Sequence, residues 1–243
     1  MNDEQDFRDR YVLPEHFLRD ENQLTGIYYY KRMNDIIKNL PKGKSVLDVG
    51  CGDGFFSGLL KEHGLKVTGI DYNKRGIAFA RALNPDCTFI EDDLRTHEFK
   101  DKFDIATFIC VLEHIAPEYH KLTLDKIHSA IKSKGKLVIT IPSVFMKVHK
   151  YHYVHFTISD IINILSNSNF EAEKVIFHNK INPILKFFYN SKFEYLLHNP
   201  YYDLKFLRKI WGNIYRKYFS LSKGFNDYRL ITVIAGKIKK QMN

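Results

Sequence analysis

Short apolar runs alternate, through the middle of the chain, with segments whose apolar residues recur at helical spacing. The runs are predicted strands, and they cover residues 46–49, 66–71, 87–90, 103–110 and 136–142. Four of these strands carry an acidic residue or a histidine at their end or just after it. Buried strands that alternate with helices are typical of a parallel sheet with its binding site at the carboxyl edge. We therefore predict a doubly wound α/β domain.

Further elements are predicted on both sides of this region. Apolar residues at helical spacing predict a helix over residues 28–40, which ends at Pro41. After the fifth strand comes a loop, and either Thr157 or Ser159 caps the helix that follows it. Two more strands are predicted, over residues 172–177 and 228–236.

The segment before the last strand differs in composition from the rest of the chain. Residues 181–224 hold eight basic and two acidic side chains, so they supply +6 of the net charge of +9. We predict a helical insertion over 179–224, with three interpretations: a lid whose aromatic side chains contact the substrate, a peripheral contact with an anionic membrane surface, or a dimer or nucleic-acid surface. The predicted domains are an N-terminal helical extension or lid (1–43), a core (44–178 and 225–243) and the insertion (179–224).

The cysteines and the apolar content exclude several classes of protein. The three cysteines lie on predicted strands or in a glycine loop. An odd number on buried elements argues against a disulfide framework and for a reducing, cytoplasmic location. The first residues include no apolar run of the kind found in signal peptides, and no stretch has the apolar length that crosses a bilayer.

A glycine-rich loop follows the first predicted strand. It has the pattern G-x-G-x-G, with Gly50 as its first glycine and Asp48 just before it. A P-loop would need a following Lys-Ser or Lys-Thr, which is absent here, and an acid beside the loop would repel phosphate. Asp71, at the end of the second strand, has the sequence distance from the loop at which a carboxylate binds ribose hydroxyls.

Taken together, these segments resemble class I S-adenosylmethionine-dependent methyltransferases. The matching pieces are VLDVGCGDG, GIDYN, EDDL, FDIATFICVLEH, GKLVITIP and HFT, in this order over roughly residues 40–178. The resemblance implies a Rossmann-like sheet of seven strands, six parallel and the last antiparallel. It also implies that the N-terminal extension lies over the cofactor and forms a wall of the substrate cleft.

The same resemblance implies a cofactor site for S-adenosylmethionine, with S-adenosylhomocysteine as product. The methionine part would contact Asp48, Gly50 and Gly52, the ribose Asp71, and the adenine Asp93 and Leu94. Cys110 would border the methionine end, and Cys51 and Tyr72 would complete the site. Acids suit this cofactor because it carries a sulfonium and an ammonium charge.

Candidate bases lie at the same predicted edge of the sheet. Glu113 and His114 follow the fourth strand, and His155 lies in the loop after the fifth. Methyl transfer to a hydroxyl needs a group that removes its proton, and histidine suits this role near neutral pH. His114 and His155 are the leading candidates, with a structural role as the alternative for each.

A metal site is the competing interpretation of these residues. Some relatives, among them small-RNA ribose methyltransferases and certain quinone-ring O-methyltransferases, have Glu-x-x-Glu-His and a later histidine. This chain has Cys110 in place of the first glutamate, which disfavours a hard cation such as Mg²⁺. The spacing of His149, His152 and His155 would also suit a transition metal. We assign no metal ligand from the sequence.

We expect methyl transfer to oxygen of a small metabolite, a sugar or a lipid-linked precursor. One alternative is RNA or protein methylation by the same fold. Another is a non-catalytic subunit that binds the cofactor and stabilises a partner. The fold hosts many acceptors and does not choose among them, and the sequence leaves the oligomeric state open.

Overall fold

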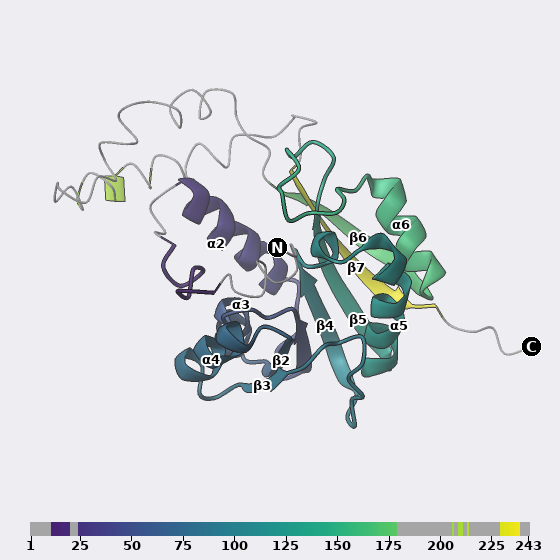
Figure 1. The fold of residues 1–243 in the computed structure, drawn as a ribbon, viewed down its shortest axis with the longest axis horizontal. Helices are drawn as coiled ribbons and strands as arrows, with labels where there is room; N and C mark the ends of the chain where they lie inside the picture. Colours follow the sequence, from purple (N-terminus) through teal and green to yellow (C-terminus); the bar gives the residue numbers. More distant parts are fainter. Residues whose placement is uncertain are drawn as a thin grey trace, which may run out of the picture.

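Seven strands of the described chain form one sheet, with the spatial order β3-β2-β1-β4-β5-β7-β6 (Figure 1). The computed structural model describes residues 11–19, 24–178 and 229–238, and the single positions 206, 209, 210 and 213. The strands are β1 (Ser45–Val49), β2 (Lys66–Asp71), β3 (Thr88–Glu91), β4 (Phe103–Ile109), β5 (Ile131–Pro142), β6 (Phe170–His178) and β7 (Leu230–Lys237). The pairs among β1 to β5 are parallel, and β7 is antiparallel to both β5 and β6. The expected sheet, with an antiparallel last strand, is confirmed.

Helices cover both faces of the sheet. Figure 1 shows α2, α3 and α4 on one side and α5 and α6 on the other. Their bounds are α2 (Leu24–Ile37), α3 (Phe55–Glu62), α4 (Lys74–Leu83), α5 (His120–Ala130) and α6 (Ile158–Asn167), with short 3-10 turns η1 (Leu112–His114) and η2 (Pro117–Tyr119). The predicted N-terminal helix is α2, which begins four residues earlier than expected.

Two apolar cores lie on opposite faces of the sheet. Successive side chains of a strand point to opposite faces, so neighbouring residues of β1 belong to different cores. Val46 belongs to the buried cluster of Met33 and Leu60, whereas Leu47 belongs to the cluster that contains Leu124. The carboxyl edge of the sheet lies between these cores and carries the loops that follow β1, β2, β4 and β5.

β5 begins earlier than the sequence predicts. Phe103 pairs with Ile131, but Ile105 pairs with Lys136, so the register shifts between these positions. The intervening residues 132–134 are exposed and polar, which hides the strand from a search for apolar runs.

The loop after β5 is closed at its base. The Phe156 N–H donates to the Pro142 carbonyl at 3.0 Å. Thr157 then caps α6: its hydroxyl accepts from the Asp160 N–H at 3.1 Å, while the Asp160 carboxylate accepts from the Thr157 N–H at 2.8 Å. Thr157 is therefore the cap, rather than Ser159. The closed base makes residues 143–157 project from the carboxyl edge.

The predicted insertion at 179–224 lies outside the described residues, apart from four single positions. Among these, Phe206 and Ile210 are exposed. Its proposed roles as a lid, a membrane contact or a nucleic-acid surface stay predictions, as does the division of the chain into domains. In the part of the chain that is described, no helix combines the length and the apolarity that a membrane crossing requires.

Candidate active site

The glycine loop after β1 has a backbone that only glycine adopts readily. Gly50, Gly52 and Gly54 have φ angles of 69°, 53° and 79°. A Cβ added to Gly50 would lie 2.4 Å from Cγ2 of Val111, which follows β4. The loop and the β4 end are therefore in direct contact, and neither a side chain nor a different backbone fits between them.

Asp71 joins the second strand to this loop. Its carboxylate accepts from the Gly52 N–H at 2.9 Å and from the Asn73 N–H at 2.8 Å. Asn73 in turn caps α4 by accepting from the Gly76 N–H at 2.9 Å. The neighbouring Tyr72 is 41% exposed. The carboxylate predicted to bind ribose thus lies against the glycine loop.

Asp48 lies beneath the loop rather than on its surface. It is 2% exposed, and its two oxygens accept from the hydroxyls of Ser57 at 2.6 Å and Thr107 at 2.8 Å. Burial raises the pKa of Asp48 to about 6, although both hydroxyls favour the charged form. Asp48 therefore links β1 to α3 and β4 by hydrogen bonds, and so stabilises the elements on both sides of the glycine loop.

The other predicted cofactor residues lie around the loop with different surroundings. Asp93 forms an ion pair with Arg95 at 2.6 Å. Leu94 is buried in one of the two cores, and Cys51 is buried beside Gly69 and Phe89. Burial raises the pKa of the Cys51 thiol well above its ordinary value.

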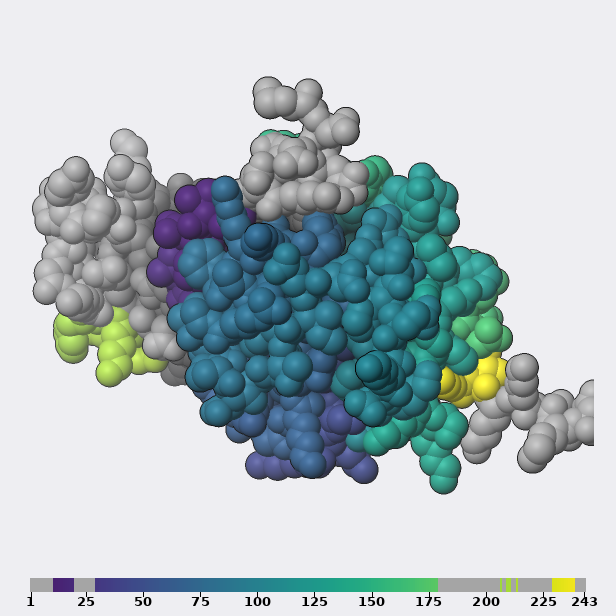
Figure 2. All heavy atoms as spheres, turned by 60° about the horizontal axis from the view of Figure 1, so that its bottom comes forward, coloured from purple at the N-terminus to yellow at the C-terminus, as the bar shows by residue number. Residues whose placement is uncertain are grey.

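The N-terminal segment 11–19 packs on the loop. His16 donates its backbone N–H to the Asp53 carboxylate at 2.9 Å, and its Nδ1 lies 3.0 Å from the same group. A Cβ on Gly52 would lie 2.2 Å from the hydroxyl of Tyr11. In Figure 2 the purple N-terminal residues lie against residues drawn in blue. The segment therefore contacts the glycine loop through His16 and Asp53, a pair that no sequence motif indicates. That the N-terminal extension lies over the cofactor stays a prediction.

Two guanidinium groups that the sequence did not single out approach the same region. Arg19 and Arg32 both lie over the ring of Tyr29, at 4.6 and 5.1 Å from its centroid. The Nε atom of each is buried and has no hydrogen-bond partner among the described residues. The positive charge of Arg32 also acts to lower the pKa of Cys110 and of Glu113, so Arg32 influences the groups that follow β4.

The chain turns sharply after β4. Cys110 has a φ angle of 56°, an uncommon value for a residue with a side chain, and its N–H donates to the Thr140 carbonyl at 2.8 Å. Burial raises the pKa of the Cys110 thiol to about 12. The turn places Glu113 in the interior, where it is 2% exposed and burial raises its pKa to about 8. Its Oε2 has no hydrogen-bond partner in the described ranges.

The histidines of the two loops are oriented by hydrogen bonds through Nδ1. His114 Nδ1 donates to the Tyr151 carbonyl at 2.9 Å, and His155 Nδ1 donates to the Met146 carbonyl at 3.1 Å. His155 Nε2 then carries the lone pair, which accepts from His152 Nδ1 at 2.8 Å. In the neutral side chains, the lone pairs of His114 and His152 are consequently on Nε2.

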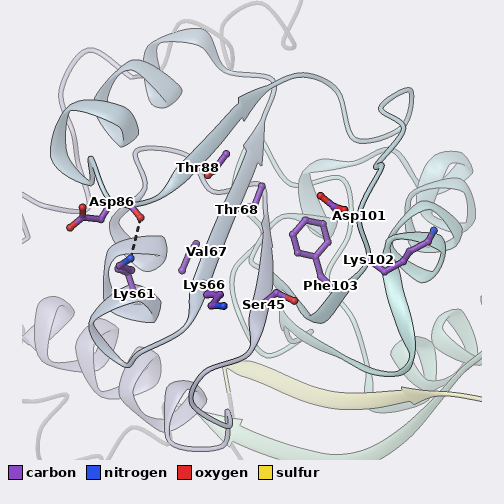
Figure 3. A pocket seen from close by; sticks show the side chains of 10 residues that line it. All are labelled: Ser45, Lys61, Lys66, Val67, Thr68, Asp86, Thr88, Asp101, Lys102 and Phe103. Carbon is purple, nitrogen blue, oxygen red and sulfur yellow. Dashed lines mark hydrogen bonds between the residues drawn. The ribbon is translucent and has the colours of Figure 1, made fainter.

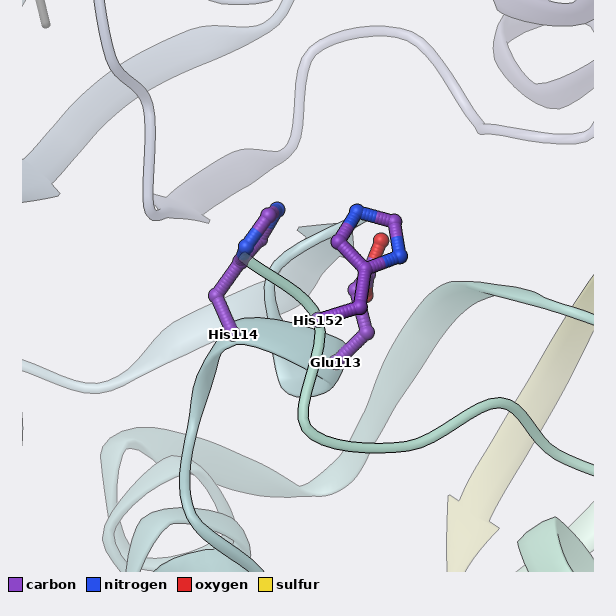
Figure 4. A group of neighbouring side chains, drawn as sticks. All are labelled: Glu113, His114 and His152. Carbon is purple, nitrogen blue, oxygen red and sulfur yellow. The ribbon is translucent and has the colours of Figure 1, made fainter. Parts of the chain in front are cut away.

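Glu113, His114 and His152 come together at the carboxyl edge (Figure 4). One ligand atom from each residue lies within 4.8 Å of the others. The rings of His114 and His152 are perpendicular, with their centroids 4.6 Å apart. Glu113 and His114 were expected at this edge; His152 lies with them, and His155 contacts the ring of His152. Spacing alone does not reveal which histidine of such a loop faces its neighbours.

A shallow pocket of about 530 Å³ lies at the opposite edge of the sheet (Figure 3). It is lined by the first residues of β1, β2, β3 and β4, including Ser45, Lys66, Thr88 and Phe103. Ligands of open α/β sheets bind at the carboxyl ends of the strands. We therefore place the active site at the glycine loop and not in this pocket.

Comparison with known proteins identifies the family of the chain. Residues 23–175, more than half of the chain, match the family model of a methyltransferase domain. The chain is similar to the ubiquinone biosynthesis O-methyltransferase of Proteus mirabilis, with 37% identity over 79 residues, which are 30% of this chain and 32% of that protein. The corresponding protein of Coxiella burnetii is 35% identical over 121 residues, 46% of this chain and 50% of the relative. The match thus spans half or less of the length of these curated relatives.

Solved structures share the fold at low sequence identity. The magnesium protoporphyrin IX methyltransferase of Synechocystis PCC 6803, determined with bound S-adenosylhomocysteine, has a TM-score of 0.64 and 14% identity over 97% of this chain and all of that one. The 1,6-didemethyltoxoflavin-N1-methyltransferase of Burkholderia thailandensis has a TM-score of 0.57 and 16% identity over 89% and 86% of the two chains. The sheet topology and the solved structures show that the chain has the class I S-adenosylmethionine-dependent methyltransferase fold. With the match to the family model, the chain belongs to the methyltransferase-domain family.

Proposed function

We propose that the protein transfers a methyl group from S-adenosylmethionine to a hydroxyl oxygen of a small molecule. The relationship that supports this proposal is the contact between the glycine loop and the end of β4, where Gly50 meets Val111. Because of that contact, the cofactor loop lies beside the polar cluster of Glu113, His114 and His152. The methyl donor and the side chains that could accept a proton would then lie together at the carboxyl edge of the sheet.

The cofactor would lie along the carboxyl ends of β1, β2 and β4. Asp71 would accept both ribose hydroxyls, since a carboxylate has about four acceptor positions. Asp93 and Leu94 would contact the adenine, and Tyr72 and Cys51 would complete the nucleotide side. Cys110 would border the methyl group.

The methionine part needs a partner for its carboxylate. Arg19 and Arg32 offer buried Nε atoms without a hydrogen-bond partner among the described residues. Guanidinium binds carboxylate in a bidentate manner, so either residue would be a suitable partner.

A hydroxyl acceptor would have to lose its proton during the transfer. The lone pairs on Nε2 of His114 and His152 are suited to receive it, with His155 holding the ring of His152 in orientation. Alignment of the acceptor oxygen with the S–CH₃ bond and exclusion of water would supply the rest of the rate enhancement. Similarity to O-methyltransferases supports oxygen as the acceptor atom. A lipid-linked acceptor belongs to the same chemical class.

Two measurements test the proposal. Calorimetry with S-adenosylmethionine should give one site per chain, and Asp71→Ala should abolish that binding. A radiolabelled-methyl assay on fractionated extract should label a small molecule, with the product stable to treatments that cleave methyl esters. Label in RNA or protein would support the rival acceptors. Binding of the cofactor without turnover on any fraction, together with a co-purifying partner, would support a non-catalytic subunit instead.

A further inference from the structure

We propose that the methyl acceptor carries a carboxylate and that Arg32 binds this group. The identity of this anion as the acceptor rests on the proposed function, but the binding of a carboxylate at Arg32 can be measured without methyl transfer. Arg32 would determine specificity, because it selects an acidic acceptor and fixes its orientation, and it takes no part in the transfer of a proton.

The first support is that two guanidinium groups share one aromatic ring. Arg19 and Arg32 lie 4.6 and 5.1 Å from the centroid of the Tyr29 ring. That ring in turn lies 5.6 Å from the ring of Phe55, which directly follows the glycine loop. Two cations so close to one ring repel each other, and an aromatic face attracts a cation without carrying a negative charge to neutralise it. The pair therefore calls for anions.

The second support is that neither guanidinium has an ionic partner in the described part of the chain. The Nε atoms of Arg19 and Arg32 are buried there without a hydrogen-bond partner. Asp35, on the same helix as Arg32, is paired with Lys31 at 2.8 Å. Glu113 forms no ion pair with Arg32, and burial raises the pKa of Glu113 to about 8, so it is mostly uncharged at neutral pH. Because a buried charge without a partner is costly, both guanidinium groups are expected to bind anions from outside the chain.

The cofactor supplies only one of these two anions, because its methionine part has a single carboxylate. Bidentate binding of that group occupies one guanidinium. The charges of Arg19 and Arg32 both act to lower the pKa of Cys110. The charge of Arg32 also acts to lower the pKa of Glu113 and of His178, at the end of β6. Arg32 is therefore the arginine closer to the polar cluster where the acceptor hydroxyl is expected, and Arg19 is left for the cofactor.

A carboxylate suits the remaining guanidinium better than a phosphate does. One negative charge neutralises Arg32, whereas a phosphate monoester carries about −1.5 to −2 and would leave an excess negative charge beside Glu113. The planar fork of a guanidinium binds a carboxylate through two parallel N–H···O bonds, and Nε of Arg32 can be one of the two donors. The acceptor is thus a small molecule with both a hydroxyl and a carboxylate.

The first test measures anion binding by the full chain saturated with S-adenosylhomocysteine, which fills the cofactor site. Benzoate and benzamide, which have nearly the same shape but differ in charge, are titrated by calorimetry. We expect one benzoate per chain and binding of benzamide weaker by at least about 10-fold, as expected for loss of a charge-assisted hydrogen bond. Arg32→Gln should weaken benzoate binding by a similar factor while the Kd for S-adenosylhomocysteine stays the same. Arg32→Lys, which keeps the charge but not the fork, should recover part of the affinity.

Lys31→Gln is the matched control, because it removes one positive charge from the same helix at a residue that pairs with Asp35. It should leave the benzoate Kd unchanged. Absence of benzoate binding, equal binding of benzoate and benzamide, or equal losses in Lys31→Gln and Arg32→Gln would each overturn the proposal. If Arg32→Gln does not fold, the comparison of Arg32→Lys with Lys31→Gln decides in its place.

The second test measures the charge of the methylated product itself. The product labelled in cell extract is applied to a strong anion-exchange resin at neutral pH and again near pH 2, roughly two units below the pKa of a carboxylic acid. We expect retention at neutral pH only. Label that passes through at neutral pH, or that is retained at both pH values as a phosphate would be, contradicts a carboxylate acceptor. If no product is labelled, the proposed function fails, and benzoate binding still decides the role of Arg32.

Discussion

His155 Nε2 accepts a hydrogen bond from His152 Nδ1 at 2.8 Å, and this contact determines which histidine faces the cluster with Glu113. Because His155 Nδ1 is occupied by the Met146 carbonyl, both of its ring nitrogens are engaged within the protein. We therefore expect His155 to act as a positioning residue for the ring of His152.

Substitution of His155 should therefore reduce turnover without changing cofactor binding. His155→Ala leaves the His152 ring without its acceptor, and loss of such an orienting group typically costs about 10–100-fold. We expect kcat to fall by that amount while the Kd for S-adenosylhomocysteine, from calorimetry, stays the same. His155→Gln, which keeps an acceptor, should recover part of the activity. An unchanged kcat in His155→Ala would remove the positioning role.

Asp71 should control cofactor affinity through two effects at once. Asp71→Asn removes the charge that would accept ribose hydroxyls and weakens the bond from the Gly52 N–H. Hydrogen bonds to charged groups contribute about 1.5–3 kcal/mol, which corresponds to a Kd higher by roughly 10–100-fold. Asp92→Asn, at an exposed carboxylate that pairs with His97, is the control and should bind normally. Equal affinities of the two variants would contradict the assigned role of Asp71.

Gly50 should tolerate no side chain. Gly50→Ala places a methyl group 2.4 Å from Val111 and requires a left-handed backbone, which alone costs roughly 1–2 kcal/mol. We expect a lower free energy of unfolding in urea and loss of cofactor binding. In the double variant Gly50→Ala with Val111→Ala, the clash is relieved but the backbone strain is not. Recovery of stability in that double variant should accordingly be partial, and full recovery would mean that the left-handed conformation is dispensable.

His16 should hold the covering segment on the loop. Burial by itself raises the pKa of Asp53, but the hydrogen bonds and charge of His16 lower it below its ordinary value. His16→Ala removes that partner from a carboxylate that is 1% exposed. We expect the cofactor Kd to rise by about 10-fold, consistent with the 1–3 kcal/mol cost of an unsatisfied buried group. His97→Ala, at a histidine that pairs with Asp92, should leave that Kd unchanged, and similar values for both variants would rule out the anchor.

His178 should make stability depend on pH. Burial lowers the pKa of His178 to about 4, and its Nε2 lies 2.8 Å from the Thr232 hydroxyl. The unfolded chain, with a pKa near 6.5, then binds the proton first, so stability falls as pH drops from about 6.5 to 4. This group alone should account for about 2 kcal/mol between pH 7 and 5.

The comparison with His178→Gln isolates that contribution. Other groups titrate in the same range, and Asp48, whose pKa is raised by burial, acts in the opposite direction. Glutamine keeps a hydrogen bond to Thr232 without titrating. Urea unfolding at both pH values should show a smaller difference for the variant than for the parent. Identical differences would mean that His178 keeps its ordinary pKa in the fold.

Local patterns in the sequence were sufficient for the sheet and the cofactor loop. Buried strands are continuous apolar runs, and a loop of alternate glycines requires backbone angles that other residues avoid, so both are visible without tertiary information. β5 shows the limit: its first residues are polar because a register shift exposes them. The contacts made by the N-terminal segment were missed for a related reason. His16 reaches Asp53 of the loop, and Arg19 reaches the ring of Tyr29, only through tertiary packing, which leaves no periodic pattern in the sequence.

In the cluster of Glu113, His114 and His152, too, the sequence locates some residues and tertiary structure alone locates the others. Glu113 and His114 follow a strand directly, so their place at the carboxyl edge could be inferred. The choice between His152 and His155 depends on which ring nitrogen meets which carbonyl, and a loop of three histidines does not encode that choice in its spacing.

The antiparallel strand β7 has a consequence for how the chain is made. β6 is hydrogen-bonded only to β7 within the sheet, while β7 comes after it by more than 50 residues. During synthesis on the ribosome, β6 emerges before the strand with which it pairs. The side of β5 that will pair with β7 is unpaired during the same period. Both edges are closed in one step when residues 230–237 arrive. Until β7 is complete, the nascent protein therefore carries two unpaired strand edges more than the finished sheet, which makes this interval the one in which a chaperone would matter most.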